Sequence, residues 1–274
     1  MTRRAGNARA DGRRLDVGAA LRAGVSAMPR MYREAWGALA FGVVAGVLPV
    51  LAPLPGGAAW VAALFQGLAV LIAWGALTRI GLTRDLGGAQ ALGLGPAGLQ
   101  LGAGEGRILA ALLLNLVFLA ILATVTSLLL LGVAGASDLD AEAIAARDWT
   151  AAGTPLQLAV VGLVAAIAIG VPLLFAVRLS LFAQASLGRG RVISLNTLGV
   201  AEGSFWPLLL LLIIVALPKI ALLALSAQGM LTGAPGQIVW VLVLALVQAP
   251  FAAGAMGEAY RRLEYWTPEM ESPT

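Results

Sequence analysis

The chain has 274 residues, of which 60% are hydrophobic and 12% are charged, against about 45–50% and about 25% in soluble domains. With a mean hydropathy of +0.91, this composition excludes a water-soluble globular domain, a disordered chain and a disulfide-stapled secreted module. The sequence has no cysteine and no histidine, which excludes thiolate, disulfide and imidazole chemistry. A polytopic helical membrane protein remains.

The first long uncharged stretch predicts a helical hairpin. Forty-four uncharged residues separate Glu34 from Arg79, and as one helix they would reach about 66 Å, twice the hydrocarbon thickness of a bilayer. A cluster of proline and glycine at 53–57 supplies the turn between two helices. We therefore expect spans near 35–52 and 59–78.

The rest of the chain predicts four more spans by the same reasoning. Thirty uncharged residues lie between Arg107 and Asp138, and the last long apolar stretch carries a single charge, Lys219. These four spans are expected near 108–134, 156–179, 204–226 and 236–257. The predicted fold class is thus an all-α, six-span membrane domain over 35–257, between a basic segment at 1–34 and a tail at 258–274.

The distribution of arginine predicts the orientation of the spans. Sixteen of the 18 basic residues fall in the N-terminal segment, in the loops after the second and fourth spans, or in the tail. The alternate loops hold only Arg147, together with four carboxylates. Because positive loops stay on the cytoplasmic side, both termini are expected in the cytoplasm. The expected location is the inner membrane of a bacterial cell, which the chain crosses several times. The arginines lie beside membrane entry points, which favours contact with anionic lipid headgroups over binding of nucleic acid.

Two segments are expected to lie in the membrane plane. Residues 16–33 place Val17, Leu21, Val25 and Met28 on one helical face, while Arg22, Arg30 and Arg33 point elsewhere and are candidate lipid contacts. The alternative is a soluble helix that docks on the cytoplasmic loops. Residues 191–202 predict a second amphipathic helix, partly buried against the bundle.

The second of these segments carries a family resemblance. Residues 193–206, which end in Gly203-Ser204-Phe205-Trp206, resemble the amphipathic helix ending in Gly-Asn-Phe-Trp that precedes the fifth span of YciC-like bacterial inner-membrane proteins. A related membrane domain occurs fused to some glycerophosphodiester phosphodiesterases. The resemblance implies a six-helix membrane bundle and implies no reaction and no catalytic residue.

Two charges near or within the spans are further candidate contacts for lipid or substrate. Lys219 is the one ionisable residue well inside a predicted span, where it could reach the headgroups, pair with Ser226 as a base, or contact a substrate. Two helical turns separate it from Ser226, which disfavours a dyad. Arg178, near the end of the fourth span, is expected to anchor a lipid phosphate or to pair with Glu202 or Glu258; a substrate phosphate is the alternative.

The pattern as a whole favours a non-enzymatic function. The sequence lacks the motifs of intramembrane peptidases, of nucleotide-binding loops and of metal or cofactor sites, and Asp138, Asp140 and Glu142 are expected in a solvated helix near 138 rather than around a cation. The leading hypothesis is a protein that senses, organises or scaffolds the bilayer, with phospholipid as its partner. A transporter or the membrane subunit of one is the alternative, and a lipid-processing enzyme is the third hypothesis.

Overall fold

The computed structural model describes residues 15–52, 56, 59–137, 139–201 and 203–264. Within these ranges every regular element is a helix, so the predicted all-α membrane class is confirmed. The first five arginines, the Pro53–Pro55 turn, Asp138, Glu202 and most of the predicted tail lie outside the described residues.

Long apolar helices dominate the chain. Within the described residues, five are long and apolar enough to cross a membrane, and a sixth span arises if α2 and α3 are counted together. These elements are α2 (Val17–Glu34), α3 (Trp36–Leu51), α4 (Ala59–Leu82), α6 (Ala103–Gly135), α8 (Pro155–Leu179), α11 (Phe205–Ala227) and the continuous helix of α12 (Gly233–Leu242), η2 (Val243–Gln248) and α13 (Ala249–Glu264). The 16 residues of α3 give a length of about 24 Å, shorter than a bilayer core.

Several helices extend beyond the predicted spans. The helix α4 continues through Arg79 to Leu82, and α13 runs seven residues past the predicted end at 257. Residues 102–106, expected as a loop, contain the first turn of α6, where a carboxylate oxygen of Glu105 accepts a hydrogen bond from the Gly102 N–H at 3.0 Å. These charges enter the helices because they are paired inside the protein, a property that spacing between charges does not reveal.

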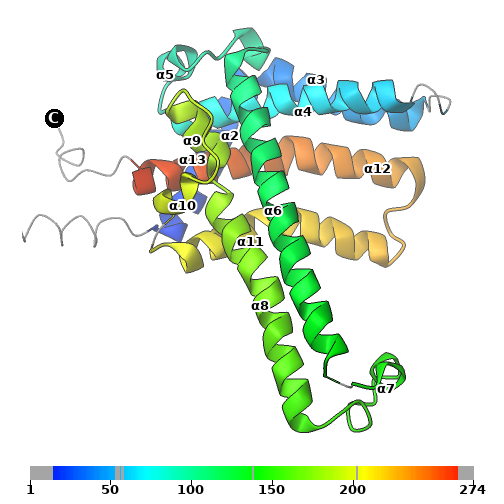
Figure 1. The fold of residues 1–274 in the computed structure, drawn as a ribbon. Helices are drawn as coiled ribbons and strands as arrows, with labels where there is room; N and C mark the ends of the chain where they lie inside the picture. Colours follow the sequence, from blue (N-terminus) through cyan, green and yellow to red (C-terminus); the bar gives the residue numbers. More distant parts are fainter. Residues whose placement is uncertain (1–14, 53–55, 57–58, 138, 202, 265–274) are drawn as a thin grey trace, which may run out of the picture.

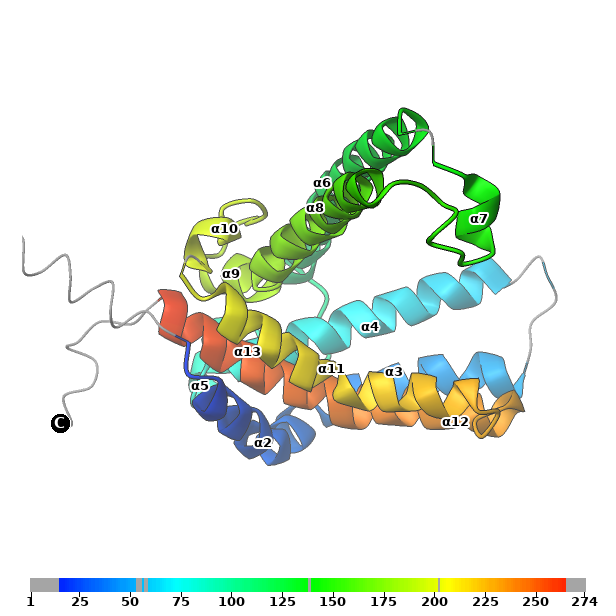
Figure 2. The same cartoon turned by 90° about the horizontal axis from the view of Figure 1, so that it is seen from below.

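The helices form two groups (Figures 1 and 2). α3, α4, α11 and the α12–α13 helix run side by side, whereas α6 and α8 form a hairpin that leans away from them and carries the short α7 (Ala141–Ala145) at its tip. The 33 residues of α6 reach about 50 Å, so this helix fits a 30 Å hydrocarbon core only when tilted. The two ends of the described chain lie at the same end of the molecule.

The predicted interfacial helix α2 packs largely on protein. An 87° bend separates it from α3, and its Ala20, Gly24 and Met31 are buried. Of the predicted apolar row, Val17 and Leu21 pack against the core, while Val25 remains 61% exposed. Docking on protein thus accounts for most of the apolar surface of α2, but the helix packs mainly on α13 and α4 and not on the cytoplasmic loops that the alternative prediction named.

The second predicted in-plane helix is a single turn, α10 (Thr197–Val200). The residues before it are held by side chains: the Ser186 hydroxyl bonds to both the N–H and the carbonyl of Ile193, and Ser194 donates to Asn115 at 2.5 Å. Such side-chain bonds compete with a helical backbone. A longer and buried helix, α9 (Phe182–Gly188), precedes the segment in which the helix was predicted. Burial of this segment against the bundle agrees with the prediction; its helical length does not.

Candidate functional site

Basic residues and an exposed tryptophan gather where α2 bends into α3. Arg33 lies in the last turn of α2 and Arg30 just before it, and Trp36 begins α3 with 62% of its surface exposed. Tryptophan at this position is typical of a membrane–water boundary. The bend therefore brings a basic helix end and an interfacial aromatic side chain together.

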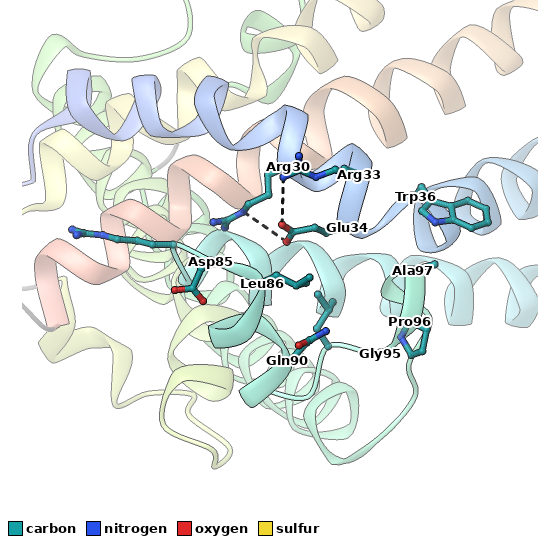
Figure 3. Close-up of a pocket in the computed structure, with 12 residues that line it drawn as sticks. Arg30, Arg33, Glu34, Trp36, Asp85, Leu86, Gln90, Gly95, Pro96 and Ala97 are labelled. Atoms are coloured by element: carbon teal, nitrogen blue, oxygen red, sulfur yellow. Dashed lines mark ion pairs between the residues drawn. The ribbon is translucent and has the colours of Figure 1, made fainter.

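A pocket of about 620 Å³ opens at this corner (Figure 3). Its second wall is the connection between α4 and α6, which contains α5 (Leu86–Ala91) and η1 (Pro96–Gly98). The lining residues are Arg30, Arg33, Glu34, Trp36, Arg84, Asp85, Leu86, Gln90, Leu94, Gly95, Pro96 and Ala97. Three arginines thus share one concave surface with two carboxylates and several apolar groups.

The polar side chains of the pocket differ in how many hydrogen bonds and ion pairs they form within the protein. The Arg30 guanidinium donates to the carbonyls of Ile80 and Thr83 at the end of α4, where the helix dipole favours a positive charge. It also lies 3.8 Å from Glu34. The Arg30 guanidinium therefore mainly links α2 to the end of α4.

Two other arginines are available to a ligand. The Arg33 side chain is 80% exposed and only reaches Glu34 at 4.0 Å, and Arg84 is exposed, with no hydrogen bond or ion pair to any residue that the structure describes. The carboxylate of Asp85 is occupied, since it accepts from the Gly88 N–H at 2.6 Å as the cap of α5. Among the three arginines, Arg33 and Arg84 are therefore the two whose guanidinium groups are accessible to an anion.

A buried ion pair fixes the second wall of the pocket. Arg79 on α4 pairs with Glu105 on α6, and the two side chains are 3% and 1% exposed. Arg79 also donates to the Leu92 carbonyl at 2.9 Å, and Gln100 links Glu105 to the Gly95 N–H. The sequence analysis placed Arg79 in a loop and did not single out Glu105. A signal was present, because both charges adjoin long apolar stretches.

Small residues let the connection pack against the bend. A Cβ atom added at Gly37 would lie 2.9 Å from Ala97, and one added at Gly98 would lie 2.9 Å from Ala35. Gly98 also has a φ of +77°, a left-handed conformation that glycine adopts without strain. Glycine at these positions therefore allows η1 to lie directly against the start of α3.

The remaining predicted site residues lie apart from this pocket. Arg22 is exposed on α2, and Lys219 is exposed on α11. The Ser226 hydroxyl accepts a bond from the Trp240 indole at 3.0 Å, so it is occupied by α12. Arg178 is half-buried in the last turn of α8, and its Nε atom has no hydrogen-bond partner within the described residues.

The two carboxylates considered as partners of Arg178 do not both lie in the described part of the chain. Glu258 bonds to Arg261 and Arg262 instead; Glu202 lies outside the described residues.

The carboxylates near α7 serve the local backbone. Asp140 caps α7 by accepting from the N–H groups of Glu142 and Ala143, and this role was expected of Asp138, which lies outside the described residues. Hydrogen bonds from the Thr150 hydroxyl and the Ala151 N–H lower the pKa of Asp148. No group of three or more potential metal ligands occurs in the described part of the chain.

Compared with models of protein families, with curated proteins and with solved structures, the chain shows no match. The class that the structure itself defines is an integral membrane protein with a basic pocket at one end.

Proposed function

We propose that this chain is a non-enzymatic protein of the bacterial inner membrane that binds anionic phospholipid headgroups in the pocket at the α2–α3 bend. In this proposal the arginine-rich end faces the cytoplasm, and the protein senses or organises the inner leaflet. The observation that carries the proposal is that Arg33 and Arg84 present exposed guanidinium groups in one pocket beside the exposed Trp36.

The chemistry of the pocket suits a lipid phosphate. Arginine binds phosphate through paired N–H groups, and each basic residue near an anionic membrane surface contributes about 1 kcal/mol. Trp36 and Leu86 supply apolar surface for the glycerol and upper acyl region, and Glu34 limits the number of anions that the pocket accepts. The resemblance to YciC-like membrane proteins is compatible with this function and adds no catalytic group.

The test is lipid binding to the full chain in neutral detergent, measured by native mass spectrometry. Phosphatidylglycerol should bind more tightly than phosphatidylcholine, and the Arg33→Gln/Arg84→Gln variant should lose about thirty-fold of the phosphatidylglycerol affinity, since two contacts of about 1 kcal/mol each are removed. The matched control is Arg147→Gln/Arg191→Gln, which removes two exposed arginines outside the pocket. Equal losses in the two variants would refute a specific site.

A further inference from the structure

A second cavity, of about 540 Å³, lies among the long helices. Its walls come from α3, α4, α11 and the α12–α13 helix, and Ser180 and Gln184 close one end where the chain leaves α8. On α4 the lining extends from Gln66 to Leu77, a rise of about 16 Å. The cavity is thus elongated along the helices and lies inside the apolar part of the molecule.

Three side-chain groups of this lining have no hydrogen-bond partner among the residues that the structure describes. They are the Ser180 hydroxyl and the amide oxygens of Gln184 and Gln248, all of which are buried. Gln184 as a residue is only 4% exposed. Buried polar groups in proteins are nearly always hydrogen-bonded. Three unpaired groups around one cavity therefore indicate a ligand that forms hydrogen bonds with them.

The three groups gather toward the arginine-rich end of the cavity. Phe182, between Ser180 and Gln184, packs edge-on against Trp74 with ring centroids 5.4 Å apart. Gln248 lies five residues before Ala253, whose backbone meets Gly81 on α4, and this register also places Gln248 near the level of Trp74.

The opposite part of the cavity is lined mainly by apolar groups, with the exposed amide of Gln66 at its far limit. Gly46, Val70 and Val241 belong to it, and a Cβ atom at Gly46 would lie only 2.8 Å from Val241. The three buried polar groups thus lie at one end of the cavity, and the rest of the lining is mostly apolar, apart from Gln66.

The backbone at Gln248 is itself unusual. Residues Val243–Gln248 form a π-helix, η2, a conformation that is rare and frequently occurs at functional sites. The following Pro250 has no N–H to donate, and the Leu246 carbonyl accepts the Tyr32 hydroxyl instead. The local backbone that presents Gln248 to the cavity is thus held by a contact from α2.

We propose that this cavity binds a single-chain lipid with an uncharged hydroxyl head, such as a monoacylglycerol or a long-chain alcohol. None of the described residues that line the cavity is charged, which disfavours an ionised head. A hydroxyl both donates and accepts, so it pairs with a serine and with an amide in either orientation. The acyl chain follows α4 past Val70, along the contact that α3 and α12 make at Gly46 and Val241. The cavity volume falls within the range of about 300–1,000 Å³ of known ligand sites.

The test compares 1-monopalmitoylglycerol with methyl palmitate, which has the same acyl chain and no hydroxyl. Native mass spectrometry of the full chain in detergent should show one bound monopalmitoylglycerol, at an affinity at least tenfold above that of the methyl ester. The Gln184→Leu/Gln248→Leu variant should bind both lipids equally. The Arg33→Gln/Arg84→Gln variant should bind monopalmitoylglycerol like the unaltered chain, because this site is independent of the headgroup pocket.

Thermal unfolding gives a second measurement on the same variants. Monopalmitoylglycerol should raise the Tm of the unaltered chain and of Asn115→Leu, which changes a buried amide outside the cavity, and should not raise that of Gln184→Leu/Gln248→Leu. Should the double variant fail to fold, Ala245→Phe, which fills the cavity from α12–α13, takes its place and should abolish binding. Equal affinity of the unaltered chain for both lipids, or a hydroxyl preference that survives these substitutions, would overturn the proposal.

Discussion

At the scale of single residues, side chains from one helix satisfy backbone carbonyls of another. Pro250 interrupts the hydrogen bonding of the α12–α13 helix, and Tyr32 on α2 donates its hydroxyl to the Leu246 carbonyl. An unpaired carbonyl in an apolar environment is costly. Tyr32, which by its spacing extends the apolar row of α2, therefore acts mainly as a hydrogen-bond donor.

Replacing this tyrosine tests the role of its hydroxyl. Tyr32→Phe should lower the free energy of unfolding by about 1 kcal/mol, since one hydrogen bond is lost and a carbonyl is left unpaired. Unfolding in mixtures of dodecyl maltoside and SDS provides the measurement. The control is Thr124→Val, because the Thr124 hydroxyl bonds only to Ala120 in its own helix; the hypothesis fails if both variants behave alike.

The buried pair of Arg79 and Glu105 predicts a strong effect of mutation. Arg79→Met leaves a carboxylate buried without its partner, which should cost about 3–5 kcal/mol of unfolding free energy. Arg79→Met/Glu105→Leu should be more stable than Arg79→Met alone, because it removes both charges. Arg189→Met, which breaks a pair that is 26% and 17% exposed, should cost about 1 kcal/mol or less. A double variant less stable than the single one would contradict this account.

At the scale of elements, α13 is the helix on which α2 and α4 dock. A Cβ atom at Gly24 of α2 would lie 2.9 Å from the Phe251 ring, and one at Gly254 would lie 3.0 Å from Gly24. On the other side, a Cβ at Gly257 would lie 2.2 Å from the Gly81 carbonyl oxygen of α4. Small residues allow such close helix crossings in membranes, so glycine positions set the geometry of this end.

Alanine substitutions on α2 measure how tightly the helix is docked. Gly24→Ala should destabilise the protein by about 1–3 kcal/mol through overpacking and should increase hydrogen exchange across α2. Gly18→Ala is the matched control on the same helix, since its nearest neighbour would lie at an ordinary 3.4 Å, and it should be neutral or slightly stabilising. Similar exchange in the two variants would show that α2 is held by lipid rather than by α13.

At the scale of the whole molecule, the α6–α8 hairpin leans away from the other helices (Figure 2). Only 6% of the most apolar window of the α8 span is buried, so lipid must cover most of this helix in a bilayer. The two ends of the described chain lie together at the end of the molecule that also carries α5, α9 and α10. This arrangement is what an even number of crossings requires.

Cysteine labelling tests the predicted orientation, because the native chain contains no thiol. Ala146→Cys, exposed beyond α7, should react with a membrane-impermeant maleimide in whole spheroplasts. Ala91→Cys, exposed in α5, should react only in inverted vesicles. The opposite pattern would invert the arginine-based orientation and place the basic pocket at the outer leaflet.

The amino-acid sequence alone was sufficient to predict the class of the fold and the approximate position of each long helix. Apolar segments of bilayer length must become helices, because in lipid only a helix or a closed barrel satisfies every backbone group. This constraint is local, so the spans near 59–78 and 156–179 could be placed without tertiary information. The positive charge at Arg30 and Arg33 could also be read directly from the sequence, because it does not depend on tertiary contacts.

The sites depended on contacts between distant residues, which periodicity does not encode. Arg79 was predicted in a loop because its partner Glu105 lies 26 positions away, and Ser180, Gln184 and Gln248 converge only when α8 ends beside the α12–α13 helix. Arg33 and Arg84 share a pocket because Arg30 joins the end of α2 to the Ile80 and Thr83 carbonyls, directly before Arg84. Tertiary packing decides such groupings, since the burial and pairing of a polar side chain depend on every helix around it.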